Sequence, residues 1–184
     1  VGITSGDLSQ GASTLTQQLI KNNVFPNFVN EETLYDRVER KLQEQFLAVQ
    51  IEKQMDKDTI MESYLNTINL GQNCLGVQAA AKRYFGKDVS ELTLSESAVI
   101  AGITQSPGTL NPITNPEGNT KRRKKVLDDM LDQGYIDKAA YYEAMADDVY
   151  SRIQTVNNAV IDDSPYSYFV DALAEQVIDD LRSQ

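Results

Sequence analysis

The stretch EETLYDRVERKLQEQFLAVQIEK, residues 31–53, contains neither Gly nor Pro, the two residues that most strongly disfavour a helix. It therefore predicts one long helix. Its apolar side chains recur every three or four residues, which predicts a stripe that faces the core. The members of this stripe are Leu34, Val38, Leu42, Phe46 and Val49.

The opposite side of this predicted helix is cationic. Three cations surround one carboxylate there: Arg37, Arg40 and Lys41 around Glu44. At about 100° per residue these four side chains fall within about 60° of one another. One interpretation is a solvated surface with ion pairs. The other is a site for a multiply charged anion such as a pyrophosphate, because Arg forks and a Lys point charge bind phosphate groups well.

The segment before it, GASTLTQQLIKN (11–22), places many uncharged hydrogen-bonding side chains around two Leu and one Ile. Ser13 is expected to cap a helix here, and Lys21 is suited to its C-terminal end. Each polar residue taken alone has such a structural explanation. Together with the cationic face on the neighbouring helix, they favour a site for a sugar–phosphate ligand.

The remaining chain is also predicted to be helical, and no convincing alternating strand pattern occurs. The loop at 104–116 contains three Pro and one Gly, and residues 147–163 are too polar and weakly patterned to predict a helix. The fold class is therefore mainly α. Further helices are expected at 57–66 after the cap Asp56, at 77–85, after the capping box at 93–96, at 116–133, at 138–145 and at 164–181.

Composition limits the possible functions. The chain of 184 residues has a net charge of -10 and no His, so it lacks the commonest zinc ligand, and no nucleic-acid partner is expected. The basic run KRRKK (121–125) is expected to be a solvated helical face, because acidic residues follow it. Cys74 is single, which excludes an internal disulfide, and it is expected to be unreactive. The chain begins with Val, so we expect it to be a piece of a longer protein.

The polar motifs resemble a known family. GASTLTQQLIKN (11–22), RKLQEQFLAVQIE (40–52), IMESYLNTINLG (60–71) and the stretch 76–112 resemble, in order and spacing, signatures of the peptidoglycan glycosyltransferases, glycosyltransferase family 51. The resemblance runs from about residue 8 to about 150. It implies a mainly α, lysozyme-like domain whose second lobe meets the membrane.

The resemblance also implies a reaction and a set of site residues. The family polymerises lipid II into glycan strands by inverting transfer, with release of undecaprenyl pyrophosphate. By resemblance, Arg40 and Lys41 would neutralise charge on the leaving pyrophosphate, and Glu44 would be the second family carboxylate. Glu44 would orient these cations or help a divalent cation, Mg²⁺ or Mn²⁺, whose ligands are unknown. The residues that would contact the sugar and pyrophosphate are Ser13, Thr14, Gln18, Lys21 and Asn22.

The family's first signature, which carries the Glu taken to be the general base, is not found in this sequence. Glu44 lies among cations and is expected to be a poor base. We therefore expect a domain that is incomplete at its N-terminus, with the donor site partly present and the base absent. Exposed apolar surface left by such a truncation would favour self-association.

Two other functions stay open. One is a lysozyme-like glycan hydrolase, although hydrolysis requires a protonated carboxyl rather than one surrounded by cations. The other is a non-catalytic module that binds lipid-linked sugar. The resemblance implies that residues 1–150 form the glycosyltransferase domain, lacking the first signature, and that residues 151–184 are a connector towards a transpeptidase domain. The location implied by resemblance is the extracytoplasmic face of the plasma membrane, with an anchor outside this chain.

Overall fold

The computed structural model describes residues 13–25 and 33–162, and it separates into two compact units, Val1–Gln78 and Ala79–Gln184. The described residues are largely helical, which confirms the prediction of a mainly α fold. No helix within the described ranges is long and apolar enough to cross a membrane. The predicted division at residue 150 stays a prediction.

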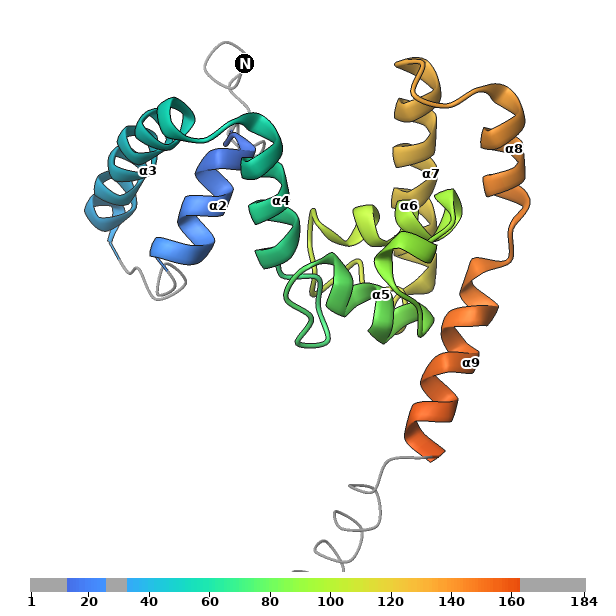
Figure 1. Ribbon diagram of the computed structural model, residues 1–184. Helices are drawn as coiled ribbons and strands as arrows, with labels where there is room; N and C mark the ends of the chain where they lie inside the picture. Colours follow the sequence, from blue (N-terminus) through green and yellow to red (C-terminus); the bar gives the residue numbers. More distant parts are fainter. Residues whose placement is uncertain (1–12, 26–32, 163–184) are drawn as a thin grey trace, which may run out of the picture. The chain divides into compact units, whose positions relative to one another are not determined.

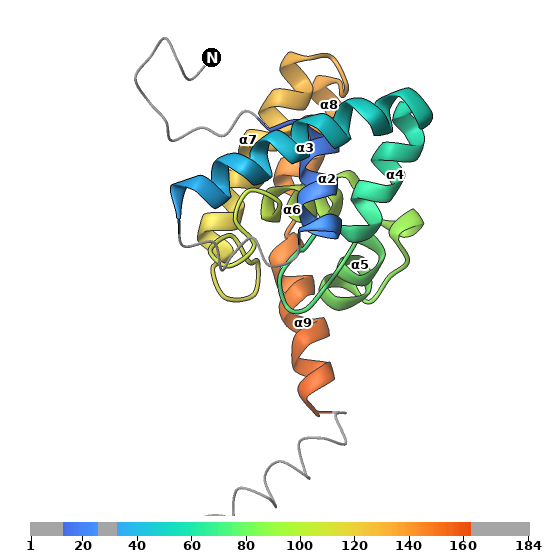
Figure 2. The same ribbon diagram turned by 90° about the vertical axis from the view of Figure 1, so that its left-hand side faces the viewer.

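Three helices are described in the first unit: α2 (Leu15–Val24), α3 (Leu34–Gln54) and α4 (Lys57–Thr67). Helix α2 packs against both α3 and α4 (Figure 1). Figure 2 shows the same unit with α3 running across α2. The elements predicted in this part of the chain are therefore confirmed, with boundaries that differ by a few residues.

The cap of α2 lies one residue later than predicted. The hydroxyl of Thr14 accepts a hydrogen bond from the backbone N–H of Gln17 at 3.2 Å, and the Gln17 side chain accepts from the N–H of Thr14 at 3.1 Å. This is a capping box, so the prediction that Ser13 caps the helix is wrong. The predicted cap Asp56 is confirmed, because its carboxylate accepts from the N–H of Thr59 at 2.7 Å.

The apolar stripe of α3 does not form the core of its unit. Its five members, Leu34, Val38, Leu42, Phe46 and Val49, have exposed fractions between 51% and 74%. The prediction that these residues face the core is therefore wrong. Periodicity shows that two sides of a helix differ, but it does not show which side the neighbouring helix covers.

The buried side of α3 is the polar one. Glu44 and Ala48, one helical turn apart, are its two buried residues. Ala48 is small and lets α2 approach closely, while Glu44 is paired with cations, which permits a buried charge. The polar side chains of α2 can form hydrogen bonds and ion pairs with this side of α3, which an apolar stripe could not offer them.

The loop after α4 closes on itself through a bridge between Asn69 and Leu75. Gly76 follows it with φ +83°, and a Cβ there would lie 2.4 Å from the carbonyl oxygen of Asn66, so glycine is required. Cys74 is buried inside this loop, which agrees with the expectation of an unreactive thiol.

Helix α6 lies at the centre of the second unit. Seven of its ten residues are buried, and it packs against α7 and α8. Its predicted capping box is confirmed, with Thr93 and Glu96 as partners. The elements of this part are α5 (Val77–Phe85), η2 (Val89–Glu91), α6 (Leu94–Ile103), α7 (Pro116–Asp132), α8 (Lys138–Ala146) and α9 (Val149–Asp162).

The basic run on α7 is only partly a solvated face. Lys124 and Lys125 are exposed and pair with carboxylates four residues later on the same helix. Arg123 is buried instead, and its guanidinium donates to the Ser95 hydroxyl at 2.9 Å and to the carbonyl oxygen of Ala144. For Arg123 the prediction is therefore wrong, because this side chain joins α6, α7 and α8.

Helix α9 was not predicted from the sequence. Val149 and Ile153 are buried one turn apart, so the required pattern is present but short. The polar residues between them hide it in a simple count of apolar positions. The helix expected at 164–181 lies outside the described residues.

Candidate functional site

Glu44 is the centre of the candidate site in the first unit. Its side chain is fully buried, and each of its carboxylate oxygens is held by a cation from the previous turn of α3. Arg40 donates through Nη1 to Oε1, and Lys41 donates through Nζ to Oε2 at 2.7 Å. Local helix geometry places the three side chains together, as the sequence predicted.

Helix α2 and Ser13, two residues before it, complete this cluster. Lys41 also donates to the hydroxyl of Ser13 at 2.9 Å, so Ser13, which precedes the cap residue Thr14, belongs to this cluster. Burial lowers the pKa of Lys21; Glu44 acts against this shift, and the cations Lys41 and Arg40 add to it. Lys21 therefore lies in the electrostatic field of the Glu44 cluster.

The third cation of the cluster differs from the one expected. Arg37 is exposed, whereas Lys21 from α2 interacts with Glu44, Arg40 and Lys41. Three cations around one carboxylate leave a local formal charge of +2. This charge, next to polar side chains of α2, can attract and hold a multiply charged anion.

The other predicted residues of α2 have different surroundings. Gln18 accepts a hydrogen bond from the Tyr64 hydroxyl of α4 at 3.4 Å, which holds its side chain in place. Asn22 is half-buried. Thr14 is exposed, and its hydroxyl is engaged in the capping box. Of the predicted set, Ser13, Lys21, Arg40, Lys41 and Glu44 form one cluster, and Gln18 is held on the α4 side of the same helix.

The residues at Glu44 do not fit a divalent metal ion. Both carboxylate oxygens already accept from cations, which oppose a further positive charge at that position. Across the described ranges no group of three or more Cys, Asp or Glu residues is placed to hold a metal. The geometry agrees with the other role expected for Glu44, which is to orient Arg40 and Lys41.

Sequence reasoning missed a second contact between α2 and α3. The hydroxyl of Thr16 donates to Oε1 of Glu52 at 2.6 Å, and Thr16 is buried. A cavity of about 440 Å³ lies beside this hydrogen bond, with Leu15, Met55 and Ile60 among its lining residues. Glu52 could have been suspected, because it lies two helical turns after Glu44 on the same side of α3.

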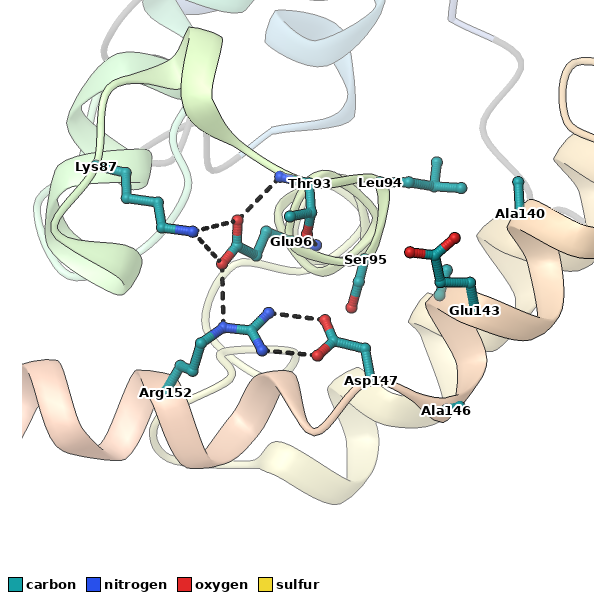
Figure 3. A pocket seen from close by; sticks show the side chains of 11 residues that line it. Lys87, Thr93, Leu94, Ser95, Glu96, Ala140, Glu143, Ala146, Asp147 and Arg152 are labelled. Atoms are coloured by element: carbon teal, nitrogen blue, oxygen red, sulfur yellow. Dashed lines mark hydrogen bonds and ion pairs between the residues drawn. The ribbon is translucent and has the colours of Figure 1, made fainter.

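A larger cleft, of about 650 Å³, lies in the second unit and contains none of the predicted site residues. Figure 3 shows four of its charged side chains, Lys87, Glu96, Asp147 and Arg152, paired with one another, while Glu143 has no interaction drawn to them. The fully buried Glu96 accepts from Lys87 at 2.9 and 3.1 Å and from Nε of Arg152 at 3.1 Å. The Arg152 guanidinium also donates two hydrogen bonds to Asp147, at 2.6 and 2.7 Å.

These pairings explain the titration of the two carboxyls in the cleft. Burial acts to raise the pKa of Glu96, but hydrogen bonds from Thr93 and Lys87 outweigh it, so the pKa is lowered. The hydrogen bonds from Arg152 lower the pKa of Asp147 to about 2. The network thus ties α9 to α6 with its charges compensated, which is a structural arrangement.

The whole sequence was also compared with known proteins. The family model described as Transglycosylase matches residues 1–131. Penicillin-binding protein 1A of Clostridium botulinum (strain Hall) is 43% identical over 181 residues, covering 95% of this chain and 21% of that protein. The protein of the same name from Vibrio cholerae is 49% identical over 147 residues, covering 80% of this chain and 17% of that protein.

A third relative, penicillin-binding protein 1A of Escherichia coli (strain K12), is 50% identical over 136 residues, covering 74% of this chain and 15% of that protein. The chain therefore spans only a small part of the length of the relatives it matches. The matched family agrees with the resemblance seen in the polar motifs.

Proposed function

The chain belongs to the transglycosylase family, and on this premise we propose that it is the domain of a peptidoglycan glycosyltransferase that binds the pyrophosphate of lipid II. The observation that carries the proposal is the cluster of Lys21, Arg40 and Lys41 around the buried Glu44. A local charge of +2 in a chain of net charge -10 is suited to a pyrophosphate.

The reaction is an inverting transfer. A sugar hydroxyl of the acceptor attacks the anomeric carbon of the donor and gives its proton to a general base other than Glu44. The bond from that carbon to the pyrophosphate oxygen breaks, and the electron pair leaves with undecaprenyl pyrophosphate. Negative charge grows on the leaving group, so Arg40, Lys41 and Lys21 stabilise the transition state more than the ground state. The growing glycan strand is the product and also a substrate of later rounds.

Glu44 acts in this proposal as a positioning residue. Its two oxygens fix the head groups of Arg40 and Lys41, so that these cations need no reorganisation when charge develops. A general base must be able to reach the acceptor hydroxyl, whereas Glu44 is fully buried and both of its oxygens hold cations. The proposal therefore does not assign the base to Glu44.

The test is binding of lipid II or inorganic pyrophosphate to the chain, measured by calorimetry. The Lys21→Ala, Arg40→Ala double variant should bind at least about tenfold more weakly, because two charge-assisted hydrogen bonds are lost. The matched control is Lys124→Ala, Lys125→Ala, which removes the same charge from the second unit. Equal binding by both double variants would contradict the proposal, and circular dichroism checks that both keep their helicity.

A membrane surface is the second proposed partner, at the extracytoplasmic face of the plasma membrane. The exposed stripe of α3 supports it, because a row of large apolar side chains on one helix face is suited to the lipid interface. Leu42→Ser, Phe46→Ser should reduce co-sedimentation with lipid vesicles about tenfold. The control Tyr135→Ser, Tyr142→Ser removes two equally exposed rings from the second unit and should leave co-sedimentation unchanged.

The two alternative functions are not favoured. A glycan hydrolase needs a carboxyl that can donate a proton to the scissile oxygen, and both carboxylate oxygens of Glu44 are engaged by Arg40 and Lys41 instead. Release of reducing ends from purified glycan by this chain would support the hydrolase function instead. A purely binding module would bind lipid II and leave it unpolymerised even within the longer protein.

A further inference from the structure

Helix α2 is attached to α3 at two separate points. One is the Glu44 cluster, where Lys41 donates to Ser13. The other is the 2.6 Å hydrogen bond from the Thr16 hydroxyl to Glu52. Because Glu52 lies eight residues after Glu44, the two points are about 12 Å apart along α3.

Between these two points α3 presents a small buried side chain, while the buried Leu19 and Ile20 of α2 and its packing on α4 also hold the helix. Ala48 occupies the middle of the contact, and a methyl group offers little to stop one helix from sliding along the other. A cavity of about 440 Å³, with Thr16, Glu52 and Ile60 among its lining residues, adjoins the N-terminus of α2. The directional restraint there is therefore the hydrogen bond itself.

We propose that the Thr16–Glu52 hydrogen bond sets the register of α2 on α3 and so places Lys21 against the Arg40–Lys41–Glu44 cluster. Thr16 and Glu52 are positioning residues in this proposal, which rests on the function proposed above. Thr16 is suited to the task, since its β-branched side chain has few rotamers and it is buried. Lys21 lies five residues further along α2, about 7.5 Å away, so a shift at Thr16 is transmitted to it through a rigid helix.

The variant Thr16→Val tests the proposal because it keeps the shape and removes the donor. The first readout is the titration of the Lys21 ammonium, followed by NMR of lysine-labelled protein. Burial lowers the pKa of Lys21 in the intact chain, so displacement of α2 should raise it toward its ordinary value. The second readout is binding of inorganic pyrophosphate, which should weaken about tenfold.

The matched control is Thr67→Val. Thr67 accepts a 3.3 Å hydrogen bond from Asn23 of α2, so this change removes a hydroxyl contact of the same helix on its α4 side. Its Lys21 titration and pyrophosphate binding should stay as in the unaltered chain, even if its melting temperature falls. Thr16→Ser, which restores the donor, should return both readouts.

Glu52 provides an independent pair of variants, because it is exposed and its replacement does not disturb a core. Glu52→Gln keeps an acceptor oxygen and should preserve the Lys21 titration, whereas Glu52→Ala should change it as Thr16→Val does. An unchanged Lys21 pKa in both Thr16→Val and Glu52→Ala would overturn the proposal. If the unaltered chain does not bind pyrophosphate, the proposed function fails, and the Lys21 titration still decides the positioning role.

Discussion

Single residues carry most of the chemistry of the first unit. Glu44 is fully buried, yet it retains two cationic partners, so its charge is compensated without water. The Ser13 hydroxyl accepts from Lys41, while the Thr14 hydroxyl caps the helix. At this scale the candidate site is a set of side chains that are already held in place by one another.

Replacing Glu44 by Gln should destabilise the chain by about 2 kcal/mol, because Arg40 and Lys41 then face each other without a carboxylate. The value is below that of a fully buried pair, since Lys41 is partly exposed. Urea denaturation measures the change in unfolding free energy. Glu62→Gln, at an exposed position of α4, is the control and should stay within about 0.5 kcal/mol.

Asp147 should make the stability of the second unit dependent on acid. Arg152 lowers the folded-state pKa of Asp147 from 3.8 to about 2, so the unfolded chain binds its proton first as the pH falls. The stabilising contribution is therefore complete above about pH 4 and is lost between about pH 4 and pH 2. Denaturation at several pH values should show a smaller loss over this window for Asp147→Asn than for the unaltered chain. Asp132→Asn, at an exposed site, should follow the unaltered chain.

At the scale of elements, the orientation of α3 decides the character of the first unit. The helix places its polar side against α2 and leaves its apolar side exposed. The small Ala48 permits this close contact, and Glu44 and Glu52 provide polar partners for α2 on either side of it. The same orientation exposes the stripe that we propose as a membrane contact.

Enlarging Ala48 should separate the two helices. Ala48→Leu inserts three carbon atoms into a buried contact and should cost about 1–3 kcal/mol of unfolding free energy, measured by urea denaturation. Val49→Leu, next to it on the exposed side, adds a methylene at no such cost. If Val49→Leu destabilised the chain more than Ala48→Leu, the orientation of α3 described above would be wrong.

For the whole molecule, net charge and exposed apolar surface have opposite effects on self-association. The net charge of -10 favours separated copies, whereas the exposed stripe of α3 favours association. Salt screens the repulsion over about 8 Å at physiological ionic strength. The extent of self-association therefore depends on the salt concentration.

Self-association should increase with salt. Sedimentation velocity between low and about 0.5 M salt should show a growing fraction of dimers or larger species, because the repulsion is screened and the apolar attraction is not. The variant Leu42→Ser, Phe46→Ser should stay monomeric over the same range. Association that falls as salt is added would indicate contacts between charged groups instead.

The sequence by itself determined most of the helices, several of their caps, the family and the grouping of Arg40, Lys41 and Glu44. Capping boxes and the pairs at Arg40–Glu44 and Lys41–Glu44 are local, so spacing along one helix is enough to predict them. Helix α9 was missed because its apolar pattern is short. Family motifs identified Lys21 before its surroundings were visible.

Only the tertiary structure decided which side of α3 is buried, that Lys21 rather than Arg37 is the third cation, and that Thr16 meets Glu52. The Thr16 and Glu52 partners are 36 residues apart in the chain. A stripe of apolar residues shows that a helix has two different sides. It does not show that the apolar side is the one buried in the core, and this is why the expectation for α3 was wrong. Close packing on a small residue and compensated charges made the polar side the better surface for α2.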